Sequence, residues 1–233
     1  MSKKFFSLLS TLLFSFSSFG VTVDKMIIIP NGSEKKTEIK VVNPDKYPVF
    51  LRVTLSELEN DNEVVELKEE QFEDWPVYLE RSEYIMGPEE EVTIPIQLLA
   101  RQIGKKQEED RILAIDIMPE SVVNGDGQGQ TMNILLGFRV WVILSKDGDV
   151  IGKPSIVLTD DGYVLKNNSN TVALFDIDLC KTTFNKNKEC KGSEFVLSGK
   201  DKKLNLSDFT NGKASVSMRD PHSRYIIEDS VKL

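Results

Sequence analysis

Val49-Phe-Leu-Arg-Val-Thr-Leu55 alternates between aliphatic residues and other side chains. Successive side chains of an extended strand point to opposite faces, so this spacing predicts a β-strand with one buried face. Six other stretches before residue 145 are rich in aliphatic and aromatic residues, and turn signals separate them. They are Val21–Ile29, Thr37–Val42, Val77–Tyr84, Val92–Leu98, Arg111–Met118 and Met132–Leu144. Seven short strands at this spacing predict an all-β sandwich.

A linker divides the chain into two parts. The segment Ser145-Lys-Asp-Gly-Asp-Val-Ile-Gly-Lys-Pro154 concentrates Gly, Asp, Lys and Pro directly after the longest apolar run. Shorter apolar stretches follow it, among them Ile156–Leu158, Ala173–Leu179 and Ala214–Met218. We therefore predict two immunoglobulin-like β-sandwich domains, residues 21–145 and a smaller one at residues 152–233. The acidic segment 63–72 is predicted to be a loop or one turn of helix.

The N-terminus is typical of an export signal. Lys3 and Lys4 precede an apolar, Ser-rich run from Phe5 to Phe16, and small residues then allow cleavage before Val21. An N-terminal anchor helix is the alternative, but about 20 apolar residues are needed to span a bilayer. Cleavage leaves about 213 residues and lowers the net charge from −8 to −10. An acidic protein attracts neither nucleic acid nor anionic lipid, so we expect neither partner and no membrane insertion.

The two cysteines fit an exported protein. Cys180 and Cys190 are separated by a polar interval that is typical of a loop between two strands. The ends of such a loop lie within disulfide reach, and an oxidising compartment favours the bond over two free thiols. This spacing does not suit paired zinc ligands, and the chain has a single histidine, so we predict no metal site.

Signals for catalysis are weak. A hydrolytic triad needs a histidine, and the single candidate, His222, lies in a polar turn near the C-terminus. The glycines of Gly125-Asp-Gly-Gln-Gly129 precede a predicted strand rather than a helix, so they do not predict a phosphate-binding loop. Carboxylates are numerous, but no pair stands out. The sequence therefore favours a binding protein with no catalytic residues, no cofactor and no small-molecule substrate.

The stretch Met132–Leu144 carries apolar residues on both faces. A half-exposed antiparallel strand should alternate apolar and polar residues. Two explanations remain open: a central strand covered on both sides, or an apolar edge strand that a partner protein completes by β-augmentation.

A series of motifs runs through the first domain in order: Val21–Lys36, Val41–Pro44, Tyr84–Ile94, Asp110–Pro119 and Met132–Leu144. Together they resemble motifs of the PapD-like periplasmic chaperones of chaperone–usher pili. Val21–Lys36 is similar to their first strand and turn, and Val41-Val-Asn-Pro44 to the end of their second strand. Tyr84–Ile94 resembles their segment of the form "l.PGe..tvri", and Asp110–Pro119 their strand "yRv.i..iP". Met132–Leu144 falls where the family has its donor strand. The series covers most of the first domain in the right order.

This resemblance implies a periplasmic chaperone with two sandwiches set at an angle. It binds incomplete pilus or fimbrial subunits along its donor strand and delivers them to an outer-membrane usher. The donor residues are expected to be Met132, Ile134 and Leu136, with Phe138 as a further candidate.

The family holds the subunit's C-terminal carboxylate with two basic residues. Arg139 matches the one on the donor strand, whereas Ile27 stands where the family's first strand has arginine, and Lys25 is the expected substitute. The family's proline-containing ending of the donor strand is also missing, and Val140-Trp-Val-Ile143 stands in its place. A secreted structural or adhesive surface protein built of two sandwiches is the alternative function.

Overall fold

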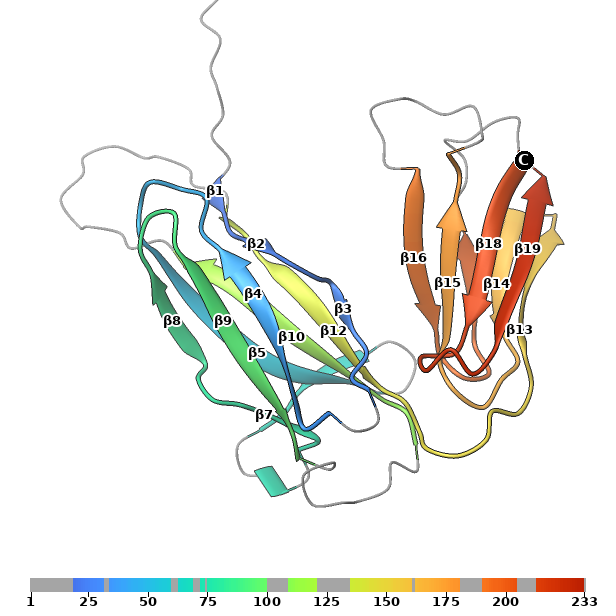
Figure 1. Cartoon of the computed structure of the whole chain (residues 1–233), viewed down its shortest axis with the longest axis horizontal. Helices are drawn as coiled ribbons and strands as arrows, with labels where there is room; N and C mark the ends of the chain where they lie inside the picture. Colours follow the sequence, from blue (N-terminus) through green and yellow to red (C-terminus); the bar gives the residue numbers. More distant parts are fainter. Residues whose placement is uncertain are drawn as a thin grey trace, which may run out of the picture.

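The chain forms two β-sandwiches joined by a linker, as the sequence predicts (Figure 1). The computed structural model describes residues 19–31, 34–59, 63–68, 72–73, 75–99, 109–120, 135–160, 162–180, 190–204 and 213–232. Among these residues the first domain contains twelve strands and the second domain seven. Within the described residues, no helix is long and apolar enough to cross a membrane.

One sheet of the first domain has the order β3-β12-β10-β5-β6, with β8 also paired to β5. The opposite sheet has the order β2-β4-β9-β7, and β1 pairs with β11 alone. The strands are β1 (Phe19–Gly20), β2 (Thr22–Val23), β3 (Ile27–Ile28), β4 (Lys36–Val42), β5 (Val49–Glu59), β6 (Glu63–Glu66), β7 (Val77–Leu79), β8 (Glu83–Met86), β9 (Glu91–Leu98), β10 (Arg111–Glu120), β11 (Leu135–Leu136) and β12 (Phe138–Leu144).

The core of the first domain follows the alternation of its sequence. Leu51, Val53 and Leu55 of β5 are at most 5% exposed, while Arg52 between them faces solvent. We predicted a loop or one turn of helix at residues 63–72. This is wrong for residues 63–66, which form strand β6 and pair with β5. The short sequence of β6, Glu-Val-Val-Glu, has two β-branched residues, and the ladder to a long neighbouring strand outweighs weak helical periodicity.

The second domain packs two further sheets, with the orders β13-β14-β17 and β16-β15-β18-β19. The disulfide predicted between Cys180 and Cys190 is formed, with Cα atoms 4.8 Å apart, and it joins the ends of β15 and β16. The strands are β13 (Pro154–Thr159), β14 (Gly162–Asn167), β15 (Ala173–Asp178), β16 (Lys191–Val196), β17 (Asp201–Leu204), β18 (Lys213–Arg219) and β19 (Ile226–Lys232).

A carboxylate fastens the two domains together. Asp110, just before β10, accepts hydrogen bonds from the backbone N–H of Lys146 (2.8 Å), the hydroxyl of Thr171 (2.9 Å) and the N–H of Val172 (2.7 Å). It thereby connects the first domain, the linker and the second domain. A small apolar cluster of Ile112, Ile143, Val172 and Leu174 packs across the same junction.

A second set of contacts anchors the linker. Ser145 Oγ lies 2.7 Å from Nε2 of His222, and the guanidinium of Arg224 donates to the carbonyl of Gly148. Arg224 is held in turn by the buried carboxylate of Asp220 at 2.7 Å. Burial raises the pKa of Asp220, but the hydrogen bonds from Arg224 and the backbone outweigh it, so the pKa lies below its ordinary value.

Candidate functional site

The last strand of the first domain has two different halves. Its second half is central: β3 pairs with it in parallel at Ile27↔Trp141 and Ile28↔Val142, and β10 pairs with it on the other side. Its first half, residues 138–140, pairs with β10 alone among the described strands. The backbone therefore presents an open edge between the short β1–β11 and β3–β12 ladders.

The two apolar faces of β12 pack against different parts of the protein. Val142 belongs to the first-domain core, whereas Ile143 and Trp141 face the cluster at the domain junction. The second domain therefore covers the second apolar face of β12, which from sequence was an argument for a partner protein. This leaves the part of the strand before Trp141 as the candidate for binding a partner.

The predicted donor positions differ in accessibility. Leu136 is 54% exposed, while Phe138 is half-buried and packs against the first-domain core. Met132 and Ile134 lie outside the described residues. Leu136 is therefore the described position whose side chain is most available to a partner.

Gly137 separates β11 from β12, so the predicted continuous strand is interrupted. A Cβ at this position would lie 2.3 Å from Sδ of Met118 and 3.0 Å from the carbonyl oxygen of Ile117. Because Gly137 has no side chain, the side chain of Met118 on β10, which is 47% exposed, can lie directly over it. Met118 and Leu136 thus place two exposed apolar side chains near the open edge. Sequence reasoning missed Met118, although its outward parity on β10 was a usable signal.

Arg139 is held by a carboxylate on the neighbouring strand. Its Nε and Nη2 donate to the two oxygens of Asp116 at 2.6 and 2.8 Å, and its guanidinium lies 5.6 Å from the ring centre of Trp141. The hydrogen bonds to Asp116 raise the pKa of Arg139. A guanidinium has five N–H donors, so three remain that are not directed at Asp116. Asp116 was not predicted, although it interrupts an otherwise apolar strand.

Lys25 lies on the segment that runs beside β12. Because Ile27 pairs with Trp141 in a parallel ladder, Lys25 and Arg139 each lie two residues before a paired residue. The ammonium group of Lys25 forms an ion pair with Asp24 at 3.0 Å. Burial raises the pKa of Asp24, but hydrogen bonds from Lys40 and Lys25 outweigh it and leave the pKa lowered.

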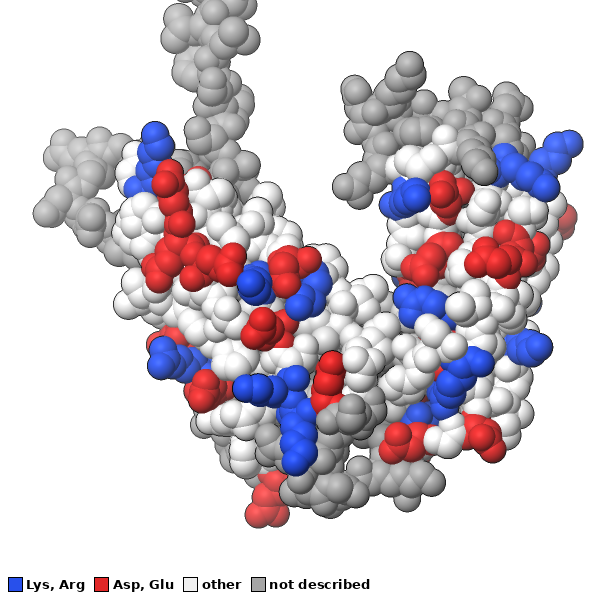
Figure 2. All heavy atoms as spheres, in the orientation of Figure 1, with Lys and Arg blue, Asp and Glu red and all other residues white. Residues whose placement is uncertain are grey.

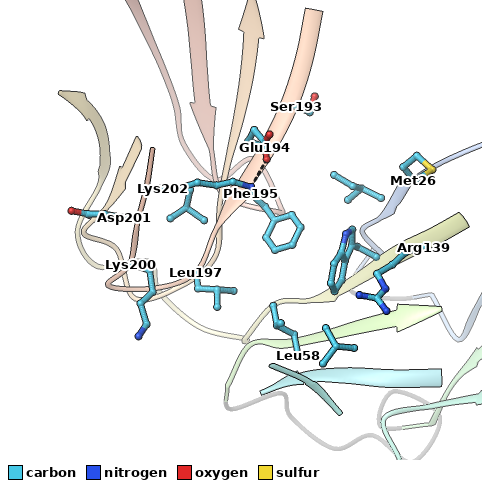
Figure 3. A pocket seen from close by; sticks show the side chains of 14 residues that line it. Met26, Leu58, Arg139, Ser193, Glu194, Phe195, Leu197, Lys200, Asp201 and Lys202 are labelled. Carbon is cyan, nitrogen blue, oxygen red and sulfur yellow. Dashed lines mark hydrogen bonds and ion pairs between the residues drawn. The ribbon is translucent and has the colours of Figure 1, made fainter. Parts of the chain in front are cut away.

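A cleft of about 620 Å³ separates the domains beside this strand. Figure 3 shows Arg139 and Met26 on one wall and Phe195 and Leu197 on the other. The rings of Phe195 and Trp141 meet edge to face with centres 5.5 Å apart. Lys25 is not among the described residues that line the cleft. No sequence pattern pointed to Phe195, because it lies 54 residues after Trp141 and in the other domain.

Two further features are the charged surface and the single histidine, His222. Acidic and basic side chains are interspersed on the face shown in Figure 2, without a basic patch. His222 contacts Ser145, but this hydroxyl belongs to a residue that is 1% exposed. Asp220 accepts a hydrogen bond from the backbone N–H of His222. Within the described residues no three His, Cys, Asp or Glu side chains are grouped to hold a metal ion.

Comparison with known proteins gives one family and one fold. The family model described as "CS5 fimbrial protein N-terminal domain" matches residues 23–145. No curated protein matches the sequence.

Several solved structures match nearly the whole chain. A chain of the Salmonella enterica SafA pilin–SafB chaperone complex has a TM-score of 0.56 at 15% identity, with 93% of this chain and 98% of that chain covered. The periplasmic chaperone SfaE has a TM-score of 0.53 at 12% identity (91% and 98% covered). The class 5 fimbriae chaperone CfaA has a TM-score of 0.52 at 10% identity (91% and 100% covered). At these identities the likeness shows the fold alone.

Proposed function

Because the chain belongs to the family of CS5 fimbrial protein N-terminal domains, we propose that it is a periplasmic chaperone that binds fimbrial subunits by donor-strand complementation. The two-domain fold that it shares with SfaE, CfaA and the SafA–SafB complex supports this proposal. Its partner is an incomplete immunoglobulin-like subunit, and it needs neither a cofactor nor a catalytic residue. Delivery of the subunit to an outer-membrane usher completes the proposed role.

The open edge at residues 138–140 is the observation that carries the proposal. Every second residue of an edge strand directs its N–H and C=O groups away from the single neighbouring strand, and an extended segment of another chain can pair with them. The edge is short because β3 closes it at Trp141. A subunit that lacks one strand of its sandwich presents the matching edge, so the two chains complete one sheet.

Removal of the predicted signal peptide lengthens this edge. Phe19 and Gly20 form β1, which pairs in parallel with Leu135 and Leu136. Cleavage before Val21 removes β1 and with it the partner of β11. In the mature chain the edge then extends from residue 135 to residue 140. In the precursor, β1 thus occupies the edge of β11 that the exported protein uses for binding.

Side chains supply the rest of the affinity. Leu136 inserts into the groove of the subunit, where full burial of a leucine stabilises by about 1.5–3 kcal/mol relative to exposure. Ile134 and Met132, two and four residues before Leu136, extend the same alternating series. Phe138 supports the strand from the core of the chaperone.

The C-terminal carboxylate of the subunit is proposed to bind Arg139. The three N–H groups not directed at Asp116 can donate to a second carboxylate, and the hydrogen bonds to Asp116 fix the orientation of the guanidinium in advance. The ring of Trp141 supports the guanidinium and leads into the cleft. Lys25 adds positive charge from the neighbouring segment.

Capture of a subunit from the periplasm tests the proposal. The tagged chain is co-expressed with fimbrial subunits of its own organism and purified from periplasm. We expect a subunit to co-purify with the wild type and to be lost from Leu136→Asp. Ile85→Asp is the matched control, because Ile85 is 76% exposed on β8 of the same domain. A wild-type protein that stays on the cell surface and captures no subunit would instead favour the adhesive-protein alternative.

A further inference from the structure

The second domain leaves one of its four sheet edges without charge. The strands β13 and β17 end one sheet, and β16 and β19 end the other. Three of these strands carry charged residues that discourage pairing with another chain: Asp201, Lys202 and Lys203 on β17, Lys191 and Glu194 on β16, Glu228, Asp229 and Lys232 on β19. β13, Pro-Ser-Ile-Val-Leu-Thr, carries none, and its single proline stands at its start. Natural edges are normally protected by charge, so the exception needs a reason.

The unprotected strand is also apolar and accessible. Val157 is 36% and Leu158 is 66% exposed, although the two side chains point to opposite faces of the sheet. Ile156 packs against the second-domain core, and its partner on β14 is the buried Leu165. In the described residues β13 pairs with β14 alone, so its other backbone edge is open.

The sequence of β13 is complementary to itself. Suppose that two copies pair in antiparallel fashion, with the two Val157 residues opposite each other. Ile156 of each copy then lies opposite Leu158 of the other, and Ser155 of each copy lies opposite Thr159 of the other. Aliphatic residues then face aliphatic residues, and hydroxyls face hydroxyls. Pairs of this kind stabilise neighbouring strands, and the arrangement has the two-fold symmetry that a closed dimer requires.

The residues that flank β13 extend this complementarity. Lys153 precedes the strand and Asp160 follows it, and both are exposed. In the same register Asp160 of each copy lies opposite Pro154 of the other, one position away from Lys153. Opposite charges therefore lie near each other at both ends, whereas a parallel arrangement would place like charges together.

We propose that two copies of this protein associate through antiparallel pairing of their β13 strands. The three-stranded sheets of the two second domains then form one six-stranded sheet that buries Val157 and Leu158. In Figure 1 β13 lies on the side of the second domain away from the first domain, while β16 lies nearest to it. The dimer leaves the last strand of each first domain free, so it has two binding strands, one at each end. This inference does not depend on what those strands bind.

Sedimentation velocity of the exported protein, purified from periplasm, tests the dimer between about 1 and 500 µM, the range expected for a small interface. We expect a monomer–dimer equilibrium in the wild type. Val157→Lys brings two ammonium groups together at the symmetry axis, so it should raise the dissociation constant at least about tenfold. Ile85→Lys, an exposed isoleucine on the first domain, should leave it unchanged. Circular dichroism checks that each variant is folded.

Charge reversal adds a test that loss of folding does not mimic. At low salt Lys153→Asp should weaken the dimer, and addition of Asp160→Lys in the same chain should restore it, because the two sites exchange signs. A wild type that stays monomeric at the highest concentration overturns the proposal, and so does a dimer that Val157→Lys leaves intact. If Val157→Lys abolishes capture of a subunit by a monomeric wild type, the edge binds that partner instead, and the proposal is also wrong.

Discussion

Asp110→Ala should loosen the junction between the two domains. The change removes the acceptor of three hydrogen bonds and leaves the N–H of Val172 and the hydroxyl of Thr171, both in residues without solvent exposure, without this partner. Hydrogen bonds to a charged group contribute about 1.5–3 kcal/mol each, and bonds that share one carboxylate add less than fully. We expect a loss of about 3–5 kcal/mol, which lowers the melting temperature by roughly 6–20 °C for a chain of this size.

Thermal denaturation followed by circular dichroism measures the loss, and small-angle X-ray scattering measures the spread of the two domains. The radius of gyration of the variant should exceed that of the wild type. Asp149→Ala is the matched control, because this exposed linker residue contacts Asn170 through its backbone carbonyl. An Asp110→Ala variant with the melting temperature and scattering curve of the wild type would refute the assignment of Asp110 as the fastening residue.

Three further changes test other parts of the structure. Reduction of Cys180–Cys190, or Cys180→Ser, should lower the free energy of unfolding by about 2–3 kcal/mol, measured in urea with and without reductant. Phe195→Ala should solvate the indole of Trp141 and shift the tryptophan emission to longer wavelength, whereas an unchanged spectrum would contradict the contact. The lowered pKa of Asp220 means that the unfolded chain binds more protons in acid, so this stabilisation is complete above about pH 4 and is lost as pH falls through the folded-state pKa. Asp220→Asn should therefore cost about 1–3 kcal/mol at pH 7 and flatten the loss of stability below pH 4 in urea titrations across pH.

Much of the fold follows from local pattern. The alternation of residues 49–55 became the buried and exposed faces of β5, because period-two burial depends only on neighbours in sequence. The disulfide followed from two cysteines that flank a polar loop. β6 was missed because a four-residue strand has too few residues to show a period, and its pairing with β5 decides its conformation.

The site was less predictable because distant residues build it. The sequence predicted Arg139 and Leu136 as site residues, but only the pairing of β10 with β12 places Asp116 beside Arg139. The cleft joins Trp141 to Phe195, which belong to different domains. The apolar second face of β12 suggested a partner protein, and the second domain covers part of it.

Hydrogen exchange of the backbone amides in the purified complex tests the central claim most directly. If a fimbrial subunit completes its sheet on the open edge, the outward-directed amides among residues 136–140, above all that of Arg139, should become strongly protected when the subunit binds, while those of β13 keep their free rate. Protection that is absent from residues 136–140 and appears elsewhere on the chain would contradict donor-strand binding at this site.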